Sequence, residues 1–283
     1  MGVRPACAWL GCRVLLLVLA LLVVGCGGGV SKWTTEGDRL LRDNDLVGAE
    51  KAYNRAIAID SHHAPALYGK GWALYLSGHE NLIPAARQLF SRCIDYDPEY
   101  WGGYRGMGVL LLDDDKVAAA ETMLRNAYEK NDREATVLLS LGQMYLRASK
   151  FEEALQLFEG AIGLEPQRGE FMRFLAELEM RQGNHAKALQ WITEGRARAV
   201  SGRRGLLLLD EGELRVHLDR ARVLVAKSLG ADDPGLPEAL RALDAADSLL
   251  EKAIQSDERL RNAGQRKRYH QRLRQQVETA MGG

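Results

Sequence analysis

Two series of small residues recur along the chain at a spacing of about 34 residues, a period that is typical of a repeat architecture. The first series is Gly37, Gly71, Gly108, Gly142 and Ala176. The second is Ala49, Ala86, Ala120, Ala154 and Ala188. In each series one step is three residues longer than the others, and the two longer steps overlap between Gly71 and Ala86. We therefore expect an insertion in the turn of residues 77–84.

A third series consists of large apolar residues, each followed three positions later by a small one. The large residues are Tyr53, Phe90, Leu124, Phe158 and Ile192, and their small partners are Ala56, Cys93, Ala127, Ala161 and Gly195. We expect each unit to be two antiparallel helices, in which small residues allow a close approach and the large residue fills the remaining gap. One such unit cannot bury its apolar face alone, so the units must stack. No segment shows the alternation of a β-strand, and the pattern therefore predicts an all-α chain.

This pattern, clearest in residues 135–168 (ATVLLSLGQMYLRASKFEEALQLFEGAIGLEPQR), resembles the tetratricopeptide repeat. The resemblance implies a right-handed superhelical solenoid, with five repeats over residues 30–201. The period is lost from residue 202 onward. There we expect a long helix over residues 205–230, a helix over residues 237–256 that completes a degenerate sixth repeat, and a capping helix over residues 258–281. Residues 202–283 thus form the degenerate repeat and the C-terminal cap.

Residues 1–25 have the composition of a signal peptide. Arg4 and Arg13 precede an unbroken apolar run from Val14 to Val24. That run is too short to span a bilayer core of about 30 Å as a helix. Residues 23–26 (VVGC) resemble the lipobox of bacterial lipoproteins.

The lipobox resemblance implies cleavage after Gly25, a diacylglycerol thioether on Cys26 and an acyl chain on the new amino terminus. Residues 26–29 would then be the lipidated cysteine and a short glycine tether. Gly27 after the cysteine, in place of Asp, favours transfer to the outer membrane in such lipoproteins. An uncleaved anchor or an ordinary secretory signal is the alternative interpretation.

The charges of the chain balance, with 38 Lys and Arg residues and 38 Asp and Glu residues. This balance argues against a protein that coats nucleic acid. Removal of the signal leaves 36 positive and 38 negative side chains, and Cys93 as the one thiol that carries no lipid. The basic charge gathers near the C-terminus, where seven Lys and Arg residues face one acid, Glu278, between residues 259 and 283. This helix presents either a solvated face or a surface for anionic lipid or an acidic partner.

Solenoids that this chain resembles bind partners along the concave face, which the first helix of each repeat lines. Projection of the repeat places on that face Tyr68, Trp72, Tyr75, Arg105, Gln143, Arg147, Arg173 and Glu177. Aromatic rings beside arginines suit an extended peptide or a partner helix. The alternative is that the aromatics only pack against neighbouring repeats.

Other chemically capable residues have plainer interpretations. His62 and His63 lie in an expected turn without metal-ligand spacing, and Cys93 occupies a small packing position. Residues 113–115, three aspartates, lie where a helix is expected to end, without the spacing of a calcium loop. No catalytic motif occurs, so we expect neither an enzyme, a metal site nor a cofactor beyond the lipid on Cys26.

Together, these features predict a lipid-anchored adaptor of the bacterial cell envelope, at the periplasmic face of the outer membrane. Its expected partners are proteins, not nucleic acid or small-molecule substrates. Its size, single anchor and repeat number resemble the pilotins of type IV pili, which help to assemble the secretin ring. Adaptors of peptidoglycan hydrolases and of outer-membrane protein assembly are the alternatives.

Overall fold

The computed structural model describes residues 28–198, 203–227, 235–255, 270–272 and 274–279. The expected signal peptide, Cys26 and most of the expected capping helix lie outside these residues. The described chain divides into two compact units, with the division inside one helix, between Gly106 and Met107. Each unit is described separately.

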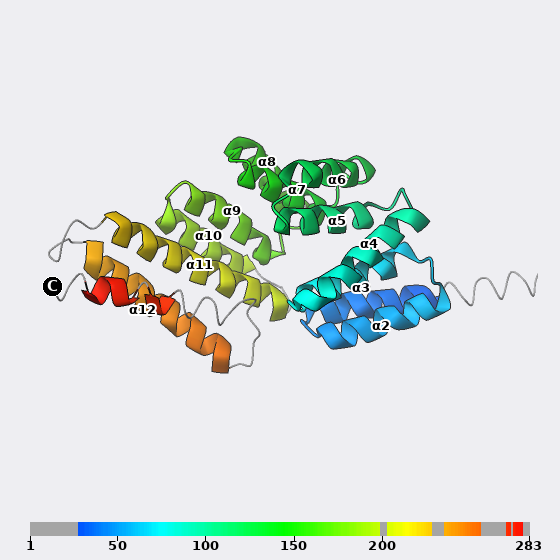
Figure 1. The fold of residues 1–283 in the computed structure, drawn as a ribbon, viewed down its shortest axis with the longest axis horizontal. Helices are drawn as coiled ribbons and strands as arrows, with labels where there is room; N and C mark the ends of the chain where they lie inside the picture. The colour runs from blue at the N-terminus through cyan, green and yellow to red at the C-terminus, as the bar shows by residue number, and fades with distance from the viewer. Residues whose placement is uncertain (1–27, 199–202, 228–234, 256–269, 273, 280–283) are drawn as a thin grey trace, which may run out of the picture. The chain divides into compact units, whose positions relative to one another are not determined.

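The first unit is built from antiparallel helix pairs (Figure 1). A helix over residues 28–42 pairs with α2 (Leu46–Ile59), and α3 (Ala64–Leu76) pairs with α4 (Ile83–Tyr96). The first turns of α5 (Trp101–Asp113) follow. A short 3₁₀ turn, η1 (Glu80–Leu82), precedes α4. The connection between α3 and α4 therefore covers residues 77–82, three more than a regular turn such as 148–150, which is the insertion that the spacing predicted.

The second unit continues the same alternation. Its helices are the rest of α5, α6 (Val117–Lys130), α7 (Ala135–Arg147), α8 (Phe151–Leu164), η2 (Gly169–Phe171), α9 (Met172–Arg181), α10 (His185–Arg198), α11 (Arg203–Lys227) and α12 (Gly235–Gln255). Residues 270–272 and 274–279 are also helical. Every regular element in the described residues is a helix, which confirms the all-α repeat fold.

The period arises from one packing contact that each helix pair repeats. Tyr53, Phe90 and Phe158 are fully buried, and each ring lies against a glycine of a neighbouring helix. A Cβ atom added to Gly142 would lie 2.4 Å from Cε1 of Phe158, well inside van der Waals contact. The small residue is therefore required, because only a bare backbone leaves room for the ring at this helix separation.

Five residues with a positive φ mark the turns inside the helix pairs. They are Asn44 (61°), Gly78 (72°), Asp115 (59°), Ser149 (59°) and Gly183 (83°). Their spacing follows the repeat, including the longer step across the insertion. Gly, Asn and Asp tolerate this left-handed region best, whereas Ser149 adopts it at some energetic cost. At Ser149 the next amide, Lys150 N–H, donates to the carbonyl of Tyr145 at 2.9 Å, which caps the end of α7.

Polar contacts supplement the apolar core where α10 meets α11. The guanidinium of Arg196 binds the carboxylates of both Asp210 and Glu213. The nearby His217 imidazole, 3.9 Å from the carboxylate, and the hydrogen bond from Arg196 outweigh burial and lower the pKa of Glu213 to about 2. The folded chain therefore stabilises the ionised form of the Glu213 carboxylate more than the unfolded chain does.

The glycine–ring contact gives a matched pair of substitutions. Gly142→Ala should lower the free energy of unfolding by about 1–3 kcal/mol, because the new methyl group must displace the buried ring of Phe158. Gly163→Ala in α8 should raise it by about 0.5–1 kcal/mol, because nothing lies within 4 Å of the added Cβ and alanine favours the helix. Urea denaturation followed by circular dichroism measures both. Equal effects of the two substitutions would contradict the packing account.

Glu213 predicts an acid dependence of stability. Its lowered pKa means that it stabilises the fold above its ordinary pKa of 4.5, and that this contribution disappears as the pH falls from there towards 2. Glu213→Gln should therefore be less stable than wild type at pH 7, by up to about 3 kcal/mol, and the difference should shrink at pH 3. Urea titrations at the two pH values test this, and a difference that does not change with pH would refute it.

Candidate functional site

Aromatic side chains from α3 and from the start of α5 form one cluster in the first unit. Tyr68, Trp72 and Tyr75 lie on one face of α3, since their spacings of four and three residues match the helical turn. The rings of Tyr68 and Trp72 have centroids 6.1 Å apart, and those of Trp72 and Tyr75 are 5.1 Å apart. The ring of Trp101 lies edge-on to Tyr68 at 5.3 Å. Each separation falls in the range of favourable aromatic pairing.

Arg105 joins the two helices of this cluster. Its guanidinium donates a hydrogen bond to the hydroxyl of Tyr68 and stacks on Trp72, 4.3 Å from the ring centroid. Phe90 of α4 lies behind both rings, with centroids 6.0 Å from Tyr68 and 6.4 Å from Trp72. The cluster thus has a rigid base with a positive charge built into it.

Exposure separates the rings that a partner can reach from those that support them. Tyr75 is only 6% exposed and Arg105 8%, so both are held inside the unit. Tyr68, Trp72 and Trp101 are each partly exposed. The aromatics therefore do pack against a neighbouring helix pair, as the alternative interpretation held, but several of them also present an edge or face to solvent.

Sequence reasoning missed Tyr100 and Trp101. The ring of Tyr100 lies 6.0 Å from Tyr68 and 5.4 Å from Trp101. Trp101 lies one turn before Arg105, on the helix that follows α4 and its turn. This spacing is visible in the sequence and could have placed Trp101 on the face of Arg105.

The remaining residues expected on the concave face belong to the second unit. Gln143 of α7 is partly exposed. Arg147 donates to the carbonyl of Leu112 and lies 3.7 Å from the Asp113 carboxylate. On α9, Glu177 accepts a hydrogen bond of 3.0 Å from Arg215. The guanidinium of Arg173, also on α9, lies 3.9 Å from the centroid of the Phe174 ring, and burial lowers its pKa. Arg147 and Glu177 thus connect successive helix pairs.

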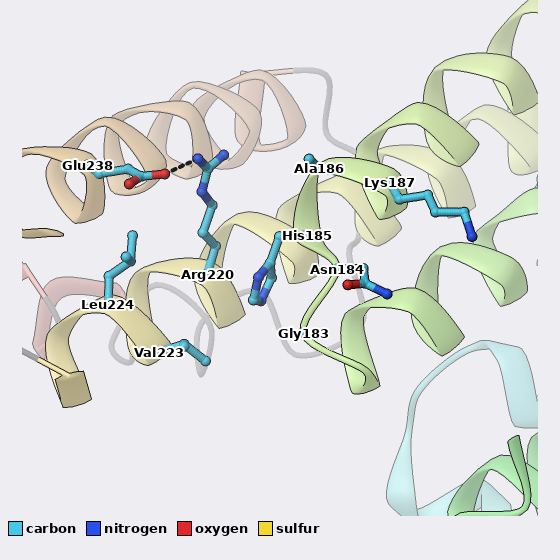
Figure 2. A pocket seen from close by; sticks show the side chains of 9 residues that line it. All are labelled: Gly183, Asn184, His185, Ala186, Lys187, Arg220, Val223, Leu224 and Glu238. Carbon is cyan, nitrogen blue, oxygen red and sulfur yellow. Dashed lines mark hydrogen bonds and ion pairs between the residues drawn. The ribbon is translucent and has the colours of Figure 1, made fainter.

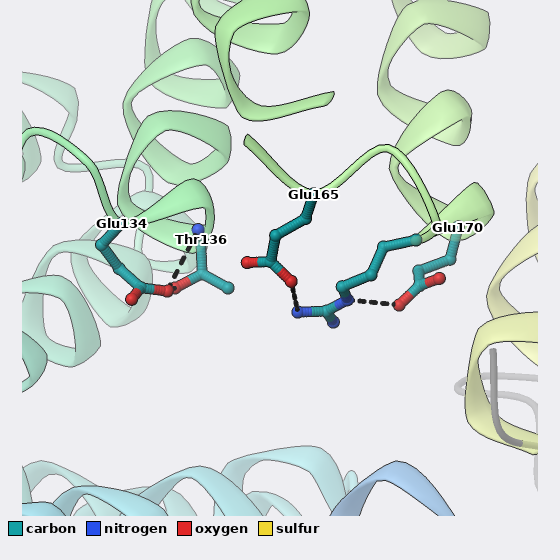
Figure 3. A network of polar contacts seen from close by, with 5 residues as sticks. Glu134, Thr136, Glu165 and Glu170 are labelled. Carbon is teal, nitrogen blue, oxygen red and sulfur yellow. Dashed lines mark hydrogen bonds and ion pairs between the residues drawn. The ribbon is translucent and has the colours of Figure 1, made fainter. Parts of the chain in front are cut away.

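A polar network orders the beginnings of α7 and α9. Figure 3 shows Glu134 accepting hydrogen bonds from the amide and hydroxyl of Thr136, at 3.4 and 2.8 Å. Close by, Arg168 donates to Glu165 at 3.4 Å and to Glu170 at 2.8 Å. The bond from the Thr136 amide to Glu134 caps the start of α7, and the bonds of Arg168 join side chains around the turn before η2, so both have structural tasks.

A pocket of about 590 Å³ lies in the second unit and is lined by Gly183, Asn184, His185, Ala186, Lys187, Arg220, Val223, Leu224 and Glu238 (Figure 2). Its charged groups bind one another or nearby residues. Arg220 binds Glu238 across the pocket, Lys187 binds Glu179, and His185 lies 3.0 Å from Asp219. Within the lining we find no nucleophile beside a base.

The other chemically capable groups have structural positions. The thiol of Cys93 is buried 3.5 Å from the carbonyl of Ala64, and burial raises its pKa to about 12, so it remains protonated and unreactive. Among the residues that the structure describes, no three His, Cys, Asp or Glu side chains converge as metal ligands. Over the same residues, no helix combines the length and the apolar character needed to cross a membrane.

Comparison with known proteins identifies the repeat. A family model described as tetratricopeptide repeat matches residues 105–168 and again residues 139–201. The human protein O-mannosyl-transferase TMTC3 is 28% identical over 117 residues, which are 41% of this chain and 13% of that protein. The chain thus spans about an eighth of the length of this curated relative.

Two solved structures extend the comparison. TTC0263, a thermophilic tetratricopeptide repeat protein of Thermus thermophilus, is 20% identical with a TM-score of 0.55, over 65% of this chain and 99% of that one. The pilF protein of Pseudomonas aeruginosa is 17% identical with a TM-score of 0.46, over 82% of this chain and 93% of that one. The first similarity supports the fold, whereas the second is too low to carry an argument. The matches show tetratricopeptide repeats over residues 105–201, and the first structural similarity shows that this chain has the fold of such a protein.

Proposed function

We propose that this chain is a lipid-anchored adaptor that binds protein partners in the bacterial cell envelope. The observation that carries the binding role is the cluster of Tyr68, Trp72, Trp101 and Arg105 on first helices of adjacent repeats. A stack of repeats offers an extended surface for a partner, and aromatic and arginine side chains contribute most to such interfaces.

The chemistry of the cluster favours an extended peptide or an amphipathic helix as its ligand. Partly exposed Tyr and Trp rings offer a large contact area and lose little side-chain entropy on binding. The arrangement of these rings is fixed before binding. Arg105 donates a hydrogen bond to Tyr68, and Phe90 packs against both Tyr68 and Trp72. A preorganised surface spends less of its binding free energy on ordering.

The anchor is proposed on sequence grounds. Residues 23–26 resemble a lipobox behind an apolar run, and an acylated Cys26 would carry two or three chains, enough for stable attachment. Gly27 favours the outer membrane, with the repeats in the periplasm. Within that compartment the secretin of a type IV pilus is the first partner to test, and peptidoglycan hydrolases and outer-membrane assembly factors are the alternatives. We infer a scaffold rather than an enzyme, because stacked repeats of this family offer a surface for binding.

Trp72→Ala should weaken partner binding by about 2 kcal/mol or more, roughly thirtyfold in Kd. The substitution removes the central ring of the cluster, which is partly exposed, whereas Tyr75→Ala would remove a buried one. Affinity purification from solubilised envelopes, with quantitative mass spectrometry of the recovered proteins, measures the loss.

Tyr128→Ala is the matched control, because this aromatic is 38% exposed on α6 and does not belong to the cluster. Melting curves of both variants show whether the fold is retained. Equal recovery of partners by wild type and Trp72→Ala would refute the binding site.

Cys26→Ala should abolish incorporation of labelled fatty acid and release the chain from the membrane fraction. The cause is chemical, since only the thiol can form the thioether. Cys93→Ala serves as the control, because that thiol is buried. Labelling of the Cys26→Ala variant would place the lipid on another residue, and absence of labelling in the wild type would refute the anchor.

A further inference from the structure

The outer face of the first helix pair combines cations with apolar side chains. Along α2, Val47, Lys51, Arg55 and Ile59 follow at steps of four residues and all are exposed, Val47 at 65% and Ile59 at 45%. Steps of four residues place side chains in one row along a helix. We call this row, together with Lys32 and Trp33 of the preceding helix, the basal face.

Trp33 connects the two helices of the basal face. The guanidinium of Arg55 stacks on its indole ring, 4.4 Å from the centroid, and the ammonium group of Lys32 lies 5.5 Å from it. A stacked guanidinium keeps its N–H groups at the edge of its plane, where they can still bind a phosphate. The indole ring of Trp33 is only partly exposed. Such a ring is suited to a boundary between polar and apolar surroundings.

The cations of this face are not neutralised from within. Lys32, Lys51 and Arg55 form no ion pair with any carboxylate of the described residues. The acids near the face include Glu50 beside Lys51, Glu36 one turn after Lys32, and Asp60 after Ile59. Glu36 pairs with Arg39 at 2.7 Å, and the Asp60 carboxylate accepts the amide of His62 at 2.9 Å. The basal face therefore carries a net positive charge with exposed apolar groups at both ends of its row.

The basal face lies close to the first described residues of the chain, and this position indicates which surface covers it. A Cβ added to Gly29 would lie 3.3 Å from Cδ1 of Ile59, so the beginning of the described chain lies beside this end of α2. Cys26 is two residues before Gly28, and two residues span at most about 7 Å. Acyl chains on Cys26 would therefore hold Ile59 and its neighbours close to the bilayer surface.

We propose that the basal face binds anionic phospholipid headgroups, so that the first repeat rests on the membrane instead of hanging from the tether. This proposal depends on the anchoring at Cys26 proposed above for its cellular setting. Lys32, Lys51 and Arg55 bind headgroup phosphates, Trp33 lies at the headgroup level, and Ile59 enters the apolar boundary. One acylated residue then fixes the orientation of the first unit as well as its location.

The test uses the chain from residue 26 with Cys26→Ser, which carries no lipid and keeps every described helix. It is sedimented with vesicles of phosphatidylcholine alone, or with about one third phosphatidylglycerol. We expect binding to the anionic vesicles, weakening with added salt, and much less binding to neutral ones. Because no acyl chain is present, this result is independent of whether Cys26 is lipidated in cells.

Lys51→Glu with Arg55→Glu should reduce binding to anionic vesicles at least tenfold, since each basic residue near such a surface contributes about fivefold. Lys130→Glu with Arg133→Glu makes the same charge change at the end of α6 and in its turn, and should have little effect. Ile59→Ser should weaken the binding that remains at high salt. Absence of wild-type binding, or equal losses in both charge-reversed pairs, would overturn the proposal. Undiminished binding of the Lys51 and Arg55 variant would overturn it too, and would move the contact to the basic residues beyond Arg259.

Discussion

The fold depends on a contact between a large ring and a bare backbone. In each helix pair of the regular repeats, a bulky side chain of the second helix occupies the space that a glycine or alanine leaves open. Tyr53 fills the space at Gly37 and Gly69, and Phe158 fills that at Gly142. The contact sets the distance between the helices, and it leaves each pair with an unburied apolar side that only another pair can cover.

Because this constraint is local and periodic, much of the fold could be predicted from the sequence. The phase of the small residues located the helix pairs, and the broken step located the insertion before α4. The left-handed residues were not predicted. Asn44 and Asp115 are residue types that tolerate this conformation, but Ser149 is not, and the conformation appears only once the turn is built.

The candidate site was predicted in part, for a similar reason. Tyr68 and Trp72 could be placed by their phase in the repeat. The role of Arg105 beneath them could not, because it depends on which of several rotamers brings its guanidinium to a tyrosine 37 residues earlier. Other polar contacts also join residues about one repeat apart, such as Arg147 to Leu112 and Arg215 to Glu177. Side chains that the sequence offered as binding groups therefore also serve to register one repeat on the next.

The left-handed turn residues have a consequence for how such a chain can change its length. Each regular turn closes its helix with its own capping bond, as Lys150 does at Ser149, and needs nothing from the turns before or after it. A stretch of gene that is copied from one turn to the next therefore carries the second helix of one pair and the first helix of the next, with one ring, one small residue and one turn. The backbone of the turns therefore permits the chain to gain or lose whole repeats. Recombination between repeats could lengthen or shorten the binding surface before any single residue is substituted.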